Sequence, residues 1–266
     1  MIKGNIDDAP ILEYDEDNAF KTRDYFFAQG KKGFDDFDTI KEKGIDKCII
    51  FLPRAFSSCT AIYRKCVKIY EFKSASTISP VYLYDNKILI ALCPLGGPAS
   101  ANLIEELQYN GIKKFIACGS CGCLDDKINI NDTFFVPTSA IRDEGLSYHY
   151  LPASRYIETS KEVNDAIINA LDKHNQKFTT GRTWTIDAIY RETPNRTQRR
   201  KKEGAIGVEM ECASICAVAK YNGLQFGEVL YFTDSINKET WEWRLYDKVK
   251  LRTHLLKICI DAIETL

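Results

Sequence analysis

Short apolar runs alternate with amphipathic segments from about residue 49 to the end of this 266-residue chain. Cys48–Leu52, Lys114–Cys118 and Val229–Phe232 are nearly all apolar, as expected for strands buried on both faces of a sheet. Helical patterns separate them, for example over residues 99–110. This alternation predicts an α/β fold with three layers and a mostly parallel, mixed central sheet.

The chain is long enough to bury one large core, and one domain is the simplest organisation. We assign residues 46–266 to this domain and residues 1–45 to an N-terminal arm. The arm is irregular and acidic, but it is rich in aromatic residues. A disordered tail would contain fewer of them. We therefore expect it to be partly helical and to pack on the domain or on a neighbouring subunit.

Charge and composition exclude several classes of partner. A net charge of −1 gives no reason to expect a nucleic acid or a membrane as the main partner. No apolar run approaches the roughly 20 residues that span a bilayer, and the acidic start lacks the pattern of a signal peptide. The ten cysteines fall mainly within apolar segments, which predicts reduced thiols and a cytoplasmic protein.

No metal or cofactor site is predicted. The three histidines form neither HxxxH nor HExxH, and Cys121 and Cys123 are too close in sequence for a usual zinc pair. We expect neither a metal nor a bound cofactor.

The segment 204–215 changes character halfway along. Ala205–Val208 is a short apolar run that predicts a buried strand, and a helical pattern starts after Glu211. Glu209 and Glu211 flank Met210 at this junction. They could be surface residues of a turn, with Glu211 favouring a helix N-terminus, or they could face a ligand. Position alone favours neither interpretation.

Two predicted strands end in glycine-rich segments. One runs into Gly96 and Gly97 before a helix, and the next ends in a predicted loop at Gly119, Ser120, Cys121 and Gly122. Parallel strands would bring both ends to the same edge of the sheet. Backbone N–H groups in such segments can approach an anion, so we expect a ligand-binding site at this edge of the sheet.

Three further segments have a predicted local structure. The polar, aromatic segment 141–152 is predicted to be a surface loop, and the basic run Arg199–Lys202 a solvated helix face. Residues 239–266 are predicted to form one long amphipathic helix.

Five motifs in order resemble the nucleoside phosphorylase family, which includes purine nucleoside phosphorylases, uridine phosphorylases and related nucleosidases. The matching segments are Gly96–Ser100, Gly119–Gly122, Asp187–Tyr190, Val208–Glu211 and Thr233–Ser235. The resemblance covers about residues 48–260. Residues 184–193, together with 142–152, look most like the branch related to uridine phosphorylase.

The resemblance implies roles for the matched residues. Met210 would pack on the ribose, Glu211 would bind its 2′- and 3′-hydroxyls, and Glu209 would support this ribose site. Asp234 would hydrogen-bond or protonate the base at N7, as a general acid does, although it could instead cap a helix. Ile189 and Tyr190 match the positions that stack on the base.

The phosphate side of the site departs from the family pattern. The phosphorolytic members carry an arginine where this chain has Ala117, and an N-terminal phosphate loop where it has residues 52–58. Arg54, Gly97, Gly119 and Ser120 remain as candidate anion ligands. Arg142 or Arg191 could also supply a guanidinium, the usual partner of phosphate.

These observations predict an enzyme that cleaves the N-glycosidic bond of a purine or uridine-type nucleoside. Inorganic phosphate is the expected co-substrate and ribose 1-phosphate the expected product. The alternatives are a hydrolytic nucleosidase, because of Ala117, and a nucleoside-binding protein without turnover. The resemblance also implies a homo-oligomer, a dimer or a hexamer, with its sites at subunit interfaces.

Overall fold

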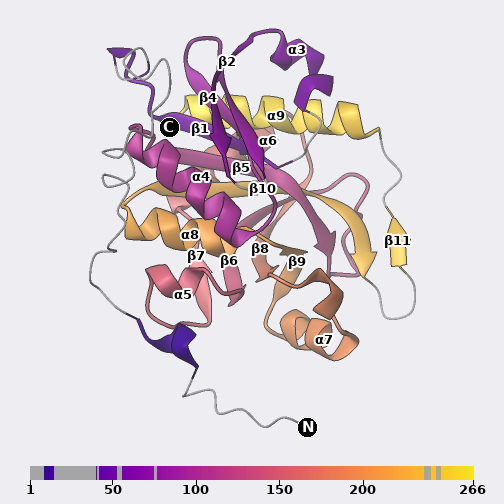
Figure 1. Ribbon diagram of the computed structural model, residues 1–266. Helices are drawn as coiled ribbons and strands as arrows, with labels where there is room; N and C mark the ends of the chain where they lie inside the picture. The colour runs from indigo at the N-terminus through magenta and orange to yellow at the C-terminus, as the bar shows by residue number, and fades with distance from the viewer. Residues whose placement is uncertain are drawn as a thin grey trace.

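The computed structural model describes residues 9–14, 40, 42–52, 56–74, 77–236, 241–243 and 247–266. Helices lie on both sides of a large mixed sheet (Figure 1). The strands are β1 (Lys47–Phe51), β2 (Cys66–Lys73), β3 (Ile78–Tyr84), β4 (Ile88–Leu92), β5 (Lys114–Cys123), β6 (Phe134–Asp143), β7 (Tyr156–Glu158), β8 (Phe178–Ile186), β9 (Ala205–Glu209), β10 (Gln225–Ile236) and β11 (Trp241–Trp243). The α-helices are α3 (Thr60–Tyr63), α4 (Gly97–Tyr109), α5 (Ser147–Tyr150), α6 (Lys161–Lys173), α7 (Pro194–Lys202), α8 (Cys212–Tyr221) and α9 (Lys248–Glu264), and the 3-10 turns are η2 (Pro10–Leu12), η3 (Phe56–Ser58) and η4 (Ile189–Arg191).

The predicted three-layer α/β architecture is confirmed. Side chains of a strand point alternately to opposite faces, and β1 shows this clearly. Cys48 and Ile50 pack in one core cluster with α4 and α8, whereas Ile49 and Phe51 pack in another with α6 and α9. The sheet is therefore covered on both faces, which explains the continuous apolar runs in its central strands.

The strand order is β11-β10-β6-β8-β9-β5-β1-β4-β3-β2, with β7 beside β6. The pairs β1–β4, β1–β5, β5–β10, β6–β8 and β8–β9 are parallel, and the edge hairpins are antiparallel. Because β10 also pairs with β5, the strands β5, β10, β6, β8 and β9 close into a ring. A cluster that includes Cys121, Phe135, Leu230 and Phe232, with Ile206 against it, packs inside this ring.

The apolar runs 81–84 and 87–92 flank Asp85-Asn86, a pattern that predicts a hairpin, and the antiparallel pairing of β3 with β4 confirms it. These two residues join β3 to β4, and both have positive φ values, 48° and 55°. Two consecutive residues in this conformation are typical of the tight turn that matches the twist of a two-stranded hairpin. The turn of this hairpin is therefore set by local sequence.

Two predicted boundaries are wrong for the same physical reason. The segment Gly119–Gly122 is not a loop, because β5 continues to Cys123 and pairs there with both β9 and β10. The C-terminal segment begins with β11, which pairs with β10, and α9 starts only at Lys248. Neighbouring strands satisfy the backbone in both cases, and a local pattern does not contain that information.

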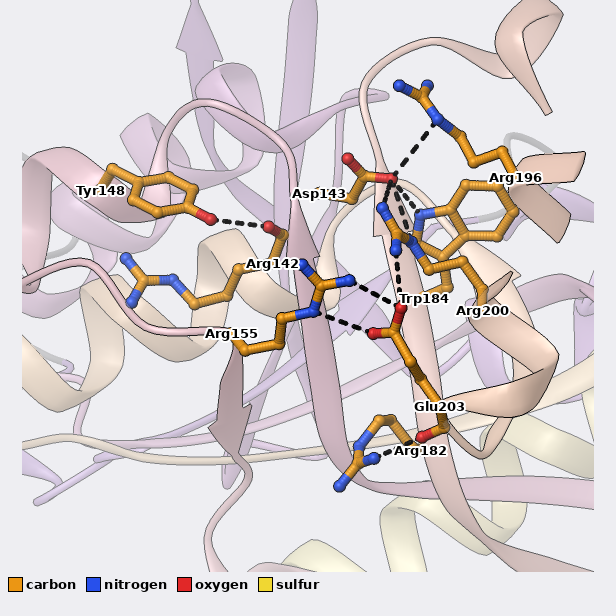
Figure 2. A network of polar contacts seen from close by, with 9 residues as sticks. All are labelled: Arg142, Asp143, Tyr148, Arg155, Arg182, Trp184, Arg196, Arg200 and Glu203. Atoms are coloured by element: carbon orange, nitrogen blue, oxygen red, sulfur yellow. Dashed lines mark hydrogen bonds and ion pairs between the residues drawn. The ribbon is translucent and has the colours of Figure 1, made fainter. Parts of the chain in front are cut away.

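The basic run of α7 is not simply a solvated face. Arg200 is only 8% exposed and donates from Nη2 to Asp143 at 2.8 Å and from Nη1 to Glu203 at 2.8 Å (Figure 2). Asp143 also accepts from Trp184 Nε1 at 2.9 Å, and Glu203 accepts from Arg155. This network joins α7 to β6 and β8 beside the ring.

Segment 141–152 is likewise more ordered than a surface loop. It contains the end of β6 and helix α5, and Arg142 is buried. The Arg142 guanidinium donates to Ser147 and Ser154 side chains and to the carbonyls of Leu151 and Pro152, at 2.6–3.1 Å. Its donors are thus engaged by residues 147–154, which leaves little capacity for an external anion.

Only residues 9–14, 40 and 42–45 of the predicted N-terminal arm are described. Ile40 and Ile45 are buried in the core of the domain, and Ile11 lies beside Gly145, just before α5. The remainder of the arm lies outside the described residues. All ten cysteines are free thiols. None of the described helices is long and apolar enough to cross a membrane.

Candidate functional site

Glu209 lies at the end of β9, where the chain turns into α8. Its Oε2 accepts hydrogen bonds from the backbone N–H groups of Glu211 at 2.7 Å and Cys212 at 2.6 Å. Its Oε1 accepts from the hydroxyls of Thr185 at 2.5 Å and Thr183 at 3.3 Å. The carboxylate therefore satisfies the free N–H groups at the start of α8, where a negative charge is favourable.

This arrangement gives Glu209 a supporting position. Burial raises the pKa of Glu209, whereas the hydrogen bonds from Thr185, Cys212 and Glu211 oppose that rise. Both oxygens are occupied by protein donors, which leaves little capacity for a ribose hydroxyl. The side chain holds the 209–212 turn and thereby fixes the position of Glu211.

Glu211 is the buried carboxylate that faces a cavity. It is 4% exposed, and its Oε1 accepts a hydrogen bond from the Gly96 N–H at 2.6 Å. Burial, together with the nearby charge of Glu209, raises the pKa of Glu211 to about 7. At neutral pH the group is therefore present in both protonation states. Met210, between the two acids, is half-buried.

The cavity has a volume of about 560 Å³ and lies at the ends of β1, β4 and β5. Its polar lining includes Ser120 and Glu211, the two residues that the sequence placed on different strands of one site. Arg252 of α9 and Tyr231 of β10 also line it. The predicted meeting of strand ends at one edge thus brings a carboxylate, a hydroxyl and a guanidinium around one space.

The two candidate glycines serve close packing. A Cβ atom at Gly97 would collide with the Ser214 side chain of α8, and one at Gly119 would collide with Leu52. The N–H group of the preceding glycine, Gly96, donates to an anion of the protein itself, the carboxylate of Glu211. The glycine-rich turn therefore orients an acid of the site, and this role was not predicted.

Asp234 lies in β10 just after an irregularity in its pairing with β5, between Phe232 and Asp234. The side chain is 8% exposed, and its Oδ1 accepts from the Thr233 hydroxyl at 2.5 Å. A bulge of this kind redirects the side chains that follow it. Because Asp234 lies within β10, it does not cap a helix.

A second acid near Asp234 was missed by sequence reasoning. Burial, and secondarily the charge of Asp234, raises the pKa of Glu192 to about 7. Glu192 follows η4, which carries both predicted base-stacking residues. Glu192 lies in a polar segment, and nothing in the local sequence marks it as a site residue. The contribution of Asp234 to its raised pKa depends on proximity to β10, more than 40 residues further along the chain.

Ile189 and Tyr190 do not line the cavity. They lie on η4 and are 54% and 96% exposed. Arg191 is also exposed. Arg54, the remaining predicted phosphate ligand, lies outside the described residues. The described part of the cavity therefore joins Glu211 to Ser120, and Ile189, Tyr190 and Asp234 are not among its lining residues.

Glu228 is a further buried carboxyl that was not predicted. It lies in β10 directly beside Ala117 of β5 and is fully buried. Burial raises the pKa of Glu228 far above its ordinary value, and the charges of Glu209 and Glu211 raise it further. Among the described residues, neither oxygen has a hydrogen bond of good geometry, although the Cys212 thiol is close by. The signal in the sequence is a single acid within the apolar run 226–232.

We expect Glu228→Gln to change how stability depends on pH. The folded protein holds the Glu228 proton above pH 4.5, where the unfolded chain releases it, so this group lowers the free energy of unfolding as pH rises. Glutamine should abolish that contribution, so the free energy of unfolding of the variant should rise relative to that of the wild type between pH 5 and pH 8, by up to about 4 kcal/mol. Urea unfolding at both pH values measures this, with the exposed acid variant Glu158→Gln as control. Parallel pH curves for the wild type and Glu228→Gln would contradict the assignment.

Among the described residues there is no group of three or more metal-ligating side chains. The site is instead a set of buried acids around a strand-to-helix turn, with a cation across the cavity. Such an arrangement can bind hydroxyl groups, stabilise positive charge and accept an anion.

Comparison with known proteins identifies the family and several relatives of this chain. The family model for the phosphorylase superfamily matches residues 62–261. Guanosine phosphorylase from Halorubrum lacusprofundi is 27% identical over 135 residues, which cover 51% of this chain and 56% of that protein. Uridine phosphorylase from Escherichia coli is 23% identical over 229 residues, which cover 80% of this chain and 89% of that protein.

A solved structure has the same fold. AMP nucleosidase from Bacteroides thetaiotaomicron superposes with a TM-score of 0.68 at 21% identity, covering 83% of this chain and 88% of that one. Two phosphorylases and one nucleosidase are thus similar to this chain.

Proposed function

The chain belongs to the phosphorylase superfamily, and from this premise we propose that it cleaves the N-glycosidic bond of a nucleoside with inorganic phosphate. The observation that carries the proposal is Glu211, a buried carboxylate held by the Gly96 N–H at the wall of a 560 Å³ cavity. Its second oxygen can accept the ribose hydroxyls. Its negative charge favours the positive charge that develops on the sugar as the bond to the base breaks.

The leaving base needs a proton or a hydrogen bond as negative charge develops on it. We assign this role to Asp234, which is buried and hydrogen-bonded to Thr233. Glu192, whose pKa of about 7 suits proton transfer at neutral pH, is the second acid at this end. Met210 would pack on the ribose, and Ile189 and Tyr190 would stack on the base.

We expect Asp234→Asn to lower kcat on purine nucleosides by roughly 10²–10⁴-fold, because it removes general acid catalysis. The loss should be smaller on pyrimidine nucleosides, which lack N7. Steady-state kinetics on inosine and uridine measure the difference, with the exposed acid variant Asp172→Asn as control. Equal losses on both substrates would indicate that Asp234 is structural.

Hydrolysis is the second candidate reaction, supported by Ala117. This position is completely buried and apolar, whereas a dianionic phosphate favours a guanidinium. The likeness to an AMP nucleosidase fold is compatible with water as the nucleophile. The two reactions differ in their sugar product, ribose 1-phosphate or free ribose.

The decisive experiment is a nucleoside panel assayed with and without phosphate, with the sugar product identified. Phosphate-dependent release of base with ribose 1-phosphate supports the proposal. Phosphate-independent release of free ribose supports hydrolysis. Binding of nucleosides with no release of base under either condition would indicate a binding protein and refute both reactions.

We also propose a homo-oligomer, a dimer or a hexamer, in which a second subunit completes the base side of the site. This is supported by the 96% exposure of Tyr190 in a segment matched to base stacking. Light scattering coupled to size-exclusion chromatography tests it. A monomer with full activity would contradict it.

A further inference from the structure

We infer that Arg252 of α9 binds a phosphate group in the cavity, from the face of the sheet opposite to Ala117. The ligand is an oxyanion, either inorganic phosphate or the 5′-phosphate of a nucleotide. This inference rests on the proposed function, because it assigns the anion side of the same cavity.

Arg252 reaches the cavity from the first turns of α9. Its Nε donates to the hydroxyl of Tyr231 at 3.2 Å, and both residues line the cavity with Ser120. Tyr231 is buried on β10 and packs on the face of the sheet that α9 covers. The tyrosine hydroxyl therefore fixes the orientation of the guanidinium.

Ser120 lies on the same face. It is paired with Tyr231 in the register between β5 and β10, and laterally paired residues in a sheet point to the same side. Ala117, three residues earlier, packs on the other face with α4 and α8. An arginine at 117 and Arg252 would thus approach the edge of the sheet from opposite sides.

The Arg252 guanidinium is available for an anion. Within the described part of the chain, no carboxylate lies within ion-pair distance of Arg252, whereas Arg200 has two such partners. Nε is engaged with Tyr231, which leaves the two Nη groups. A guanidinium with two parallel donors matches a phosphate, and the exposed Ser120 hydroxyl can donate a third hydrogen bond.

The test is phosphate binding, measured by thermal denaturation and by calorimetric titration on the full-length protein. Inorganic phosphate and AMP are titrated separately into the wild type, Arg252→Gln, Arg252→Lys and the control Lys250→Gln. Lys250 lies on the same helix with its side chain 87% exposed. Circular dichroism of each variant confirms that it is folded.

We expect the wild type and Lys250→Gln to bind at least one of the two ligands with the same Kd. Arg252→Gln should weaken that binding roughly 10–100-fold, the loss of charge-assisted hydrogen bonds. The Kd of Arg252→Lys should lie between those of the wild type and Arg252→Gln, because lysine keeps the charge but lacks the paired donors. Unchanged binding by Arg252→Gln, or no binding of either ligand by the wild type, would overturn the inference.

The two ligands also separate the two sources of the phosphate group. If Arg252→Gln loses affinity for inorganic phosphate alone, Arg252 belongs to the co-substrate site. If it loses affinity for AMP alone, Arg252 belongs to a site for the 5′-phosphate of a nucleotide. These measurements need no turnover. If no nucleoside releases its base but Arg252-dependent binding persists, the proposed function fails while this assignment stands.

Discussion

Glu211→Gln is expected to lower kcat/KM for the nucleoside substrate by roughly 10²–10³-fold, the usual cost of removing one group that stabilises charge in a transition state. The substitution keeps the shape and the hydrogen bond from the Gly96 N–H. It removes the negative charge next to the developing sugar cation. Steady-state kinetics measure the loss, with Glu158→Gln as the matched control on an exposed strand position.

The pH dependence gives this prediction a second readout. With a pKa of about 7 for Glu211, the ionised fraction rises with pH, so the kcat/KM of the wild type should rise through about pH 7 and then level off. Glu211→Gln should lose this rise. The variant Glu192→Gln is needed beside it, because Glu192 has a similar pKa. A Glu211→Gln enzyme within twofold of the wild type, with the same pH profile, would rule out the assigned role.

Glu209→Ala is expected to destabilise the protein by about 3–5 kcal/mol. The variant leaves the buried N–H groups of Glu211 and Cys212 and the hydroxyl of Thr185 without their acceptor. Each buried group left unsatisfied costs about 1–3 kcal/mol, and such effects are only partly additive. The free energy of unfolding in urea, followed by circular dichroism, measures the loss.

Two companion variants calibrate this effect. Glu209→Gln keeps one acceptor oxygen and should lose less than Glu209→Ala. Thr185→Val removes one donor to Glu209 and the acceptor of the Ala213 N–H, and it should cost about 1–3 kcal/mol. A loss below 1 kcal/mol for Glu209→Ala would show that the start of α8 does not depend on this carboxylate.

The β9–α8 junction illustrates how far local sequence reaches. The change from an apolar run to a helical period correctly predicted a strand, a turn with two acids and a helix. The resemblance to the family assigned the ribose hydroxyls to Glu211 and a supporting role at the ribose to Glu209. In the folded protein Glu209 is occupied by Thr183, Thr185 and the α8 backbone, so only Glu211 faces the cavity. The difference arises from β8, more than 20 residues earlier in the chain.

The charged residues were hardest to place from the sequence. Arg200 and Arg142 looked like surface cations, but both are buried because acids or carbonyls from other elements satisfy their donors. Arg252 gave no signal within an amphipathic helix. The burial of a charge depends on whether partners are available, and those partners are set by the packing of distant segments.

The sequence by itself determined the α/β architecture, the central strands β1, β5, β9 and β10, the β3–β4 hairpin and the location of the acids at a strand-to-helix turn. These features depend on hydrophobic period and turn chemistry, which act over a few residues. Only the tertiary structure decided that β5 and β10 close a ring, that Glu209 accepts from the N–H groups at the start of α8, that Glu228 is buried beside Ala117, and that Arg252 and Ser120 line the same cavity. Each of these depends on contacts between segments far apart in the chain, where burial and hydrogen-bond partners are fixed by packing.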